Sequence, residues 1–399
     1  MPAVPGDLRN RETEKQHTMN TDIETSAAIN LESLLTPVTK LSNDVRKALR
    51  QRGGGITSSE ARYLVDLYYD MQKARIVSNN RVKGLDRDAR KSGNVAEPHQ
   101  GIDWLFNQQN ALENQIKAIL SIYVETHPMV WFFEQTLGVG PVIAAGLLAH
   151  IDIDRAPTAG HVWRFAGLDP SQKWASRQEL TELYDAQEGS VEERTRAVSK
   201  LIGRDPETVI RDATTNFATG KTSGKLTKDK AVKSLCRIPF NRQLKTICWK
   251  LGESFVKVCN KPGAYYGRVY KERKGYEWGR NLRGELSDQA TSKLAKTKIG
   301  SDTDAKAWYA GECSPEKARE MLEAGETPTA AKCRVETGGV PMLPPAHIQA
   351  RAKRYAVKLF LAHLHQRWRE EEGLPCPAPW VITHGGHAHY HQPPQVAPM

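Results

Sequence analysis

The stretch best suited to bind a ligand runs from Thr136 to Pro141, Thr-Leu-Gly-Val-Gly-Pro, between two apolar segments. Gly138 and Gly140 permit positive φ and place no Cβ in the path of an approaching group. Pro141 suits the first position of a helix, whose free amides and positive dipole end favour a phosphate. The pattern predicts a helix-hairpin-helix that holds the DNA backbone through Gly138, Val139 and Gly140 and reads no bases. A tight turn between two packed helices is the alternative.

Positive charge is concentrated downstream of this turn. Residues 221–298 contain 20 Lys and Arg against 6 Asp and Glu, a net charge of +14 in a chain whose total is +11. Neutralisation of phosphates with release of counterions requires such a concentration. A solvated basic surface without a partner is the alternative interpretation. The basic residues expected to contact DNA are Lys221, Lys225, Lys228, Arg237, Arg242 and Lys245.

A second DNA-contacting element is indicated within residues 195–213. Gly203 separates two short helical patterns there, as in a helix-turn-helix. Residues 206–213 would be the recognition helix, with Thr208 and Arg211 directed to DNA. A surface helical hairpin with a glycine turn fits the same pattern. The apolar residues expected to face inward are Ala197, Val198, Leu201 and Ile202.

Two other sets of side chains could do chemistry. Four histidines, His384, His387, His389 and His391, crowd a Gly- and Pro-rich tail and could chelate a transition metal. No Cys or carboxylate accompanies them, so we expect incidental binding only, with no functional metal and no cofactor. Exposed tryptophans beside basic residues could stack on bases. The candidates are Trp163, Trp249, Trp278, Trp308 and Trp368, of which the apolar neighbours of Trp163 and Trp368 favour core packing.

From Thr158 the chain reads Thr-Ala-Gly-His-Val-Trp-Arg-Phe-Ala-Gly-Leu-Asp-Pro. With the preceding turn, this stretch resembles the C-terminal transposase domain of the insertion-sequence family numbered one hundred and ten. Members of that family carry Gly-hydrophobic-Gly-Pro and then a helix that ends in Ala-Gly-Leu-x-Pro. Weaker similarities cover residues 239–245, 264–271 and 351–360. The positions that match the main motif are Gly138, Gly140, Pro141, Ala166, Gly167, Leu168 and Pro170.

The resemblance also implies catalytic elements. Family members carry an N-terminal RuvC-like nuclease domain with four acidic metal ligands and use a guide RNA. The sequence before the helical pair is too short for that domain, so we expect no metal-dependent cleavage by this chain alone. The second catalytic element of the family is a nucleophilic serine, which the resemblance assigns to Ser223, flanked by Lys221 and Lys225. The same Thr-Ser-Gly-Lys stretch is typical of a flexible basic linker.

The elements that position these residues are expected to be helices in a mainly α fold. Thr57 and Glu60 have the spacing of a capping box, and apolar residues recur at helical spacing after Leu64 and after Leu105. Two long antiparallel helices follow from this pattern. The predicted organisation is a disordered arm at 1–30, a helical hairpin or spacer at 31–127, a transposase-like domain at 128–274 with an insertion at 176–222, a polar insertion at 275–345, a closing helix at 346–372 and a His- and Pro-rich tail at 373–399.

Composition narrows the class of protein. None of the six cysteines forms a CxxC pair, and no secretory signal opens the chain. No apolar run approaches the roughly 20 residues of a membrane helix. We expect a soluble, cytoplasmic, transposase-derived DNA-binding protein, encoded by a mobile element or phage, that acts on double-stranded DNA in recombination, in transposition or as an architectural binder.

Two alternatives remain open at this stage. The chain could be an active serine-dependent transposase or recombinase component that uses Ser223. It could instead be an RNA-binding or virion-associated structural protein, in which case a guide or structured RNA is the partner. A homo-oligomer is compatible with each of these readings, and a membrane partner with none.

Overall fold

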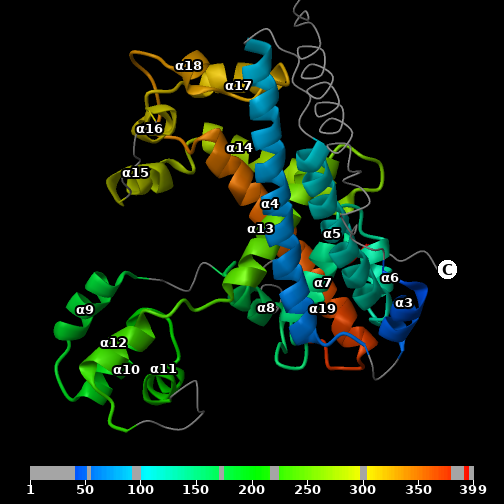
Figure 1. Ribbon diagram of the computed structural model, residues 1–399. Helices are drawn as coiled ribbons and strands as arrows, with labels where there is room; N and C mark the ends of the chain where they lie inside the picture. Colours follow the sequence, from blue (N-terminus) through cyan, green and yellow to red (C-terminus); the bar gives the residue numbers. More distant parts are fainter. Residues whose placement is uncertain are drawn as a thin grey trace, which may run out of the picture. The chain divides into compact units, whose positions relative to one another are not determined.

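The computed structural model describes residues 41–51, 55–91, 100–169, 175–215, 224–296, 303–378 and 391–394. These ranges contain helices α3 to α19 and no β-strand, apart from one isolated bridge between Cys313 and Arg334 (Figure 1). The mainly α fold predicted from the sequence is therefore confirmed. The predicted arm at 1–30 lies outside the described residues. The chain divides into two compact units, Met1–Tyr123 and Val124–Met399.

The first unit contains a long helical pair, as the sequence predicts. Thr57 and Glu60 form the expected capping box: the Thr57 amide donates to Glu60 Oε2 at 2.8 Å and the Glu60 amide to Thr57 Oγ1 at 3.2 Å. Ion pairing between Arg75 and Glu113, with N–O at 2.5 Å, joins the two long helices. The helices of this unit are α3 (Asn43–Arg50), α4 (Ser58–Lys91) and α5 (Gln100–Glu125).

The two long helices run antiparallel. Ser58 Oγ at the start of α4 lies 3.4 Å from the Tyr123 hydroxyl near the end of α5. The Arg75–Glu113 pair joins a later residue of α4 to an earlier residue of α5, which fixes their opposite directions. Leu85 and Leu105, both in the predicted apolar stripes, are exposed, because the buried contacts gather at the start of α4 and the end of α5. The buried apolar side chains are Ala61, Val65, Ile116, Leu120, Ile122 and Tyr123.

The second unit is built around one long helix near its C-terminal end. Figure 1 shows α19 running beside α13 and α14, and α7 also packs on α13 while α8 packs on α19. Phe360 of α19 lies at the centre of an aromatic cluster, with its ring centroid 5.6 Å from Phe132, 5.7 Å from Phe255 and 5.1 Å from Tyr266. The central helices are α6 (Val130–Glu134), α7 (Pro141–His150), α8 (Ala159–Phe165), α13 (Arg242–Val258), α14 (Tyr265–Leu282) and α19 (Pro345–Glu371).

Four short helices form what we call the α9–α12 cluster. Capping boxes begin α9 at Ser176 and α10 at Ser190, and Asp205 and Thr227 cap α11 and α12, which explains why these polar stretches are helical. The cluster has its own core of Leu180, Tyr184, Val198, Val209 and Leu235, among others. Its helices are α9 (Arg177–Asp185), α10 (Val191–Leu201), α11 (Pro206–Thr214) and α12 (Lys228–Leu235).

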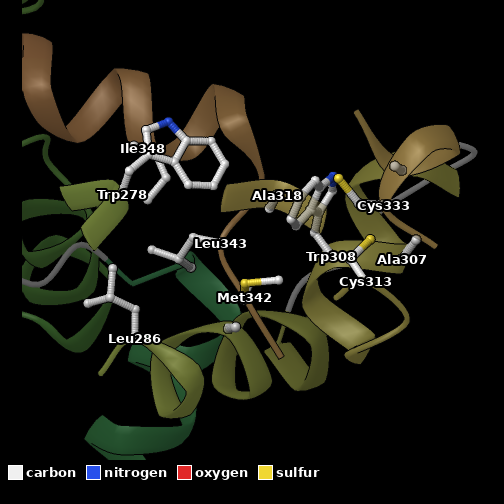
Figure 2. Close-up of a cluster of buried hydrophobic side chains, with 12 residues drawn as sticks. Trp278, Leu286, Ala307, Trp308, Cys313, Ala318, Cys333, Met342, Leu343 and Ile348 are labelled. Atoms are coloured by element: carbon white, nitrogen blue, oxygen red, sulfur yellow. The ribbon is translucent and has the colours of Figure 1, made fainter. Parts of the chain in front are cut away.

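Residues 275–345, predicted as a polar insertion, contain a hydrophobic core of their own. Figure 2 shows Trp278, Trp308, Met342 and Leu343 within it, and the two indole centroids lie 6.1 Å apart. α14 continues through residue 275 without a break. The other helices here are α15 (Ser287–Lys296), α16 (Thr303–Ala310), α17 (Pro315–Glu323) and α18 (Ala330–Cys333).

None of the helices in the described ranges combines the length and apolar character needed to cross a membrane.

Candidate nucleic-acid interface

The turn between α6 and α7, residues 138–140, will be called the glycine turn. Gly138 has φ of 101°, in the left-handed region that only glycine adopts easily, as the sequence predicts. Gly140 differs from the prediction: its φ of −88° is open to any residue, because it already has the extended conformation of a helix N-cap. Gly140 is exposed, and a Cβ added there would meet no atom within 4 Å.

The glycine turn is held in place by α13. Gly138 O accepts a hydrogen bond from Ser254 Oγ at 2.5 Å, and a Cβ at Gly138 would lie 3.1 Å from Val258 Cγ2. Pro141 occupies the first turn of α7, and no side chain caps the amides of that turn. A turn that is half-buried at Gly138 and Val139 and exposed at Gly140, at an uncapped helix start, can accept an anionic group such as a phosphate.

α7 itself is buried against α13. A Cβ at Gly146 would lie 2.7 Å from Ile247 Cδ1, so the glycine allows the two helices to approach closely. Ala144, Ala145 and Ala149 are buried on the same helix. The small residues of α7 therefore serve packing, and only the turn before it remains open to a ligand.

The start of α13 is fixed by Asn241. Its side-chain Oδ1 accepts from the Leu244 amide at 2.9 Å, and its own amide donates to Phe165 O of α8 at 2.8 Å. Arg242 and Lys245 follow on the first two turns of α13, both exposed. Within the described residues, neither of these two cations forms an ion pair with a carboxylate.

The Ala-Gly-Leu motif packs directly against this helix start. Gly167 has φ of 65°, and a Cβ there would lie 2.7 Å from Phe240 Cγ and 3.1 Å from Lys245 Cδ. Lys245 Nζ in turn lies 4.0 Å from the centre of the Phe240 ring. Two motifs that are far apart in the sequence, at Ala166–Leu168 and at Phe240–Lys245, therefore meet at one place.

The other basic candidates lie around α12. Lys228 Nζ is 2.5 Å from Asp185 Oδ1, and Arg237 Nη1 is 3.4 Å from Asp212 Oδ2, so both cations already have carboxylate partners. Lys225 is exposed. Lys221 and the candidate nucleophile Ser223 lie outside the described residues, as does Pro170 of the family motif.

The candidate helix-turn-helix consists of α10 and α11 with Gly203, φ 71°, between them. Val198 and Ile202 face inward as predicted, but Leu201 is 57% exposed and its prediction is wrong. The inward face of α10 follows Thr195, Val198 and Ile202 at helical spacing, and Leu201 lies to one side of it.

The two candidate contact residues of α11 differ in exposure. Thr208 is half-buried, and its amide donates to the N-cap Asp205 at 2.8 Å. The Arg211 side chain is 70% exposed and lies 3.9 Å from Asp212. Their contact with DNA stays a prediction.

Of the five candidate stacking tryptophans, Trp249 is the exposed one, at 61%. Trp278 and Trp308 are buried in the core of residues 275–345, so the prediction that they stack on bases is wrong. Trp368 is buried, as predicted. Trp163 donates from Nε1 to Lys358 O at 2.9 Å, and the Lys358 ammonium lies over its ring at 4.3 Å.

The tail histidines are described only in part. His384, His387 and His389 lie outside the described residues. His391 Nε2 is 3.3 Å from the Tyr355 hydroxyl, and its carbonyl is 2.8 Å from His363 Nε2, so it contacts α19. Among the residues that the structure describes, no group of His, Cys, Asp and Glu is arranged to hold a metal ion.

Two adjoining hollows follow the exposed face of α13. One, of about 430 Å³, is lined by Gly167, Leu168, Asp169, Lys245, Trp249 and residues of α19; the other, of about 580 Å³, shares Lys245 and Trp249 and adds Phe240 and Arg242. Lys353 and Arg354 of α19, which the sequence analysis did not single out, reach the first hollow. Their only signal was the weak family similarity at residues 351–360.

Comparison with known families covers the glycine turn and α8. Residues 132–182 match the model of the family described as transposase IS116/IS110/IS902, which confirms the resemblance over the glycine turn and the Ala-Gly-Leu motif. The match associates this part of the chain with transposition and DNA binding. No curated protein and no solved structure gave a match.

Proposed function

We propose that this chain binds double-stranded DNA in a transposition-related process. The glycine turn and the first turns of α13 hold the phosphate backbone. One observation carries the proposal: the family match at residues 132–182 covers the glycine turn with its exposed Gly140, and Ser254 attaches that turn to the helix that presents Arg242 and Lys245. Cations without a carboxylate partner retain their full attraction for phosphate.

Such contacts give affinity without sequence preference. Backbone amides and side-chain cations at phosphates set register and orientation on the duplex but carry no direct base information. The proposed role is therefore that of a general DNA-holding element, derived from a mobile-element transposase, in recombination or DNA architecture. Double-stranded DNA is the proposed partner.

Replacement of Gly140 by Val tests the proposal. Its φ of −88° suits valine and the space around it is open, so the fold should be retained while the side chain blocks the phosphate. We expect roughly tenfold weaker binding to every duplex, the value of one charge-assisted hydrogen bond of about 1.5 kcal/mol. Fluorescence anisotropy with three unrelated duplexes at one salt concentration measures the loss.

Gly84→Val in α4 is the matched control, because a Cβ there also meets nothing within 4 Å. It should leave affinity unchanged. A loss confined to one duplex sequence would show that the turn reads bases, and equal affinities of the Gly140 variant and the native chain would show that the turn serves packing alone. Either result refutes the proposal.

A further inference from the structure

The hollow of about 430 Å³ beside α13, which we call the α13 hollow, is assembled from three separate stretches. It is lined by the turn Gly167 to Asp169 after α8, by one face of α13, and by α19 from Ala350 to Val357. Leu168, Cys248 and Val357 supply apolar lining, and Lys245, Arg354 and Asp169 supply charged groups. An apolar hollow of this volume with few polar groups has the character of a small-ligand site.

One wall of the α13 hollow is an exposed indole. Trp249 follows Lys245 by four residues and Arg242 by seven, so the three side chains share one face of α13. Burial of a tryptophan is strongly favourable, yet 61% of Trp249 is exposed. Trp249 also borders the second hollow, together with Phe240 and Arg242.

The cations around this indole are not held in ion pairs. Arg242, Lys245 and Arg354 form no ion pair with a carboxylate in the described part of the chain, whereas the neighbouring Lys353 is paired with Glu253. Burial lowers the pKa of the Lys245 ammonium, and the positive charge of Arg354 lowers that pKa further. A phosphate between these two cations would relieve their mutual repulsion.

The occupant that fits is a nucleotide whose base is not paired. An indole beside a hollow offers a stacking surface, but in a duplex each base face is already covered by its neighbours. Asp169 can accept a hydrogen bond from an N–H on the edge of an unpaired base, such as N3–H of thymine. An unpaired nucleotide thus offers a partner for the indole, for the carboxylate and for the cations of the hollow.

We infer that the α13 hollow holds one unpaired nucleotide of DNA, with its base stacked on Trp249 and its phosphate bound by Lys245 and Arg354. This inference rests on the proposed function for the choice of DNA as the ligand. It adds a site for single-stranded or distorted DNA to the backbone contacts of the glycine turn.

Three labelled DNA ligands test the inference with the full chain: a paired duplex, the same duplex with one extra unpaired thymidine, and that duplex with an abasic residue in place of the thymidine. The native chain should bind the thymidine ligand about tenfold more tightly than the abasic one, within the range for stacking of one base. Trp249→Ala should abolish this ratio, and Trp249→Phe should retain most of it.

Tyr276→Ala is the matched control. Tyr276 is a 54% exposed aromatic side chain with Arg273 and Arg280 over its ring at 4.8 and 5.9 Å, but it lies on α14 outside the hollow. The Tyr276 variant should keep the native ratio. Thermal melting of each variant checks that the helices remain folded.

Each of the other outcomes overturns the inference, the choice of DNA or the proposed function. A native chain that binds the thymidine and abasic ligands equally, a ratio that survives Trp249→Ala, or an equal loss on the paired duplex overturns the inference. Tighter, Trp249-dependent binding of an unpaired uridine in an RNA duplex overturns the choice of DNA. A native chain that shows the ratio but whose duplex affinity is insensitive to Gly140→Val refutes the proposed function and leaves this inference intact.

Discussion

Two regions of the second unit carry the candidate DNA contacts, and they use their charges differently. In α13, residues 242–258, 4 Lys and Arg stand against 1 Glu, whereas residues 175–215 around α9, α10 and α11 contain 6 Lys and Arg against 9 Asp and Glu. Arg196 of the α9–α12 cluster pairs with Glu192 at 2.7 Å and Glu207 at 3.0 Å. Arg204 donates to the carbonyls of Ser234 and Leu235, each at 2.9 Å.

Arg196 and Arg204 therefore stabilise the cluster itself, while Arg242 and Lys245 form no ion pair with a carboxylate in the described residues. The number of basic residues in a segment does not identify a phosphate-binding surface. The presence of cations without an internal partner does, because an arginine that already binds carboxylates or carbonyls must lose those bonds before it can bind DNA.

Titration separates the same two regions. Burial is the largest cause that lowers the pKa of His127, His347 and His363 to about 4, and all three lie in the second unit outside the α9–α12 cluster. Residues 175–238, which include the α9–α12 cluster, contain no histidine. Acidification should therefore destabilise the two regions at different pH values.

The largest expected effect is loss of stability on acidification. His127 is half-buried, with its ring 5.1 Å from that of Trp368, and its Nδ1 accepts from the Met129 amide at 3.1 Å. Because its folded pKa is about 4 and its unfolded value 6.5, the unfolded chain takes up the proton first. Stability is full above pH 6.5 and declines as pH falls to about 4, by about 3 kcal/mol for His127 alone.

Thermal melts between pH 7 and 4, followed by tryptophan fluorescence, measure this decline, because the described tryptophans lie outside the α9–α12 cluster. His127→Gln should reduce the decline. Hydrogen exchange should show the amides of α9 to α12 protected to lower pH than those of α13 and α19. Simultaneous loss of protection in both regions would contradict the comparison.

A smaller effect is expected from reversal of charge at the start of α13. Arg242→Glu with Lys245→Glu should weaken duplex binding roughly hundredfold, since each lost charge-assisted contact is worth about 1.5 kcal/mol. Each lost phosphate contact should also reduce the slope of log affinity against log salt by about 0.9. Anisotropy titrations over a series of salt concentrations give both quantities.

The control variant, Arg177→Glu with Lys200→Glu, reverses the charge of two exposed residues of the α9–α12 cluster. Its net charge therefore changes by the same amount as that of the α13 double variant. It should alter affinity only slightly and leave the salt slope unchanged. Equal losses in the two double variants would mean that overall charge, and not the α13 face, governs binding.

Local patterns predicted local structure well. The Thr57–Glu60 capping box, the long helical pair and the start of α7 at Pro141 all depend on residues within a few positions of each other. The prediction that Leu201 faces inward was wrong because, at the last turn of a short helix, a shift of one residue separates the buried face from the exposed one. The prediction that Trp278 and Trp308 stack on bases was wrong because the polar average composition of residues 275–345 concealed a small apolar core.

The candidate site could be predicted only in pieces. The glycine turn and the Ala-Gly-Leu motif were visible as motifs, and the family match includes both. Their meeting with Trp249 and Arg354 depends on the packing of α13 against α19, whose residues are a hundred positions apart. Periodicity cannot reveal a hollow formed by three such stretches, nor which of many basic residues lack an internal partner.

The smallest effect is expected from the candidate recognition helix. Arg211→Gln with Thr208→Ala should change duplex affinity less than about twofold, because the carboxylate of Asp212 lies 3.9 Å from Arg211 and the surrounding segment is acidic. A base-reading contact would be worth about 1–3 kcal/mol, at least roughly fivefold, and would depend on sequence.

Selection from a random duplex pool, with the native chain and the double variant in parallel, can detect such a preference even when its target is not known in advance. Arg242→Gln should lower recovery of all sequences equally. A motif enriched by the native chain and lost only in the α11 variant would make α11 a recognition helix and reverse the comparison, because a region with an acidic surplus would then supply specificity to the phosphate-binding face.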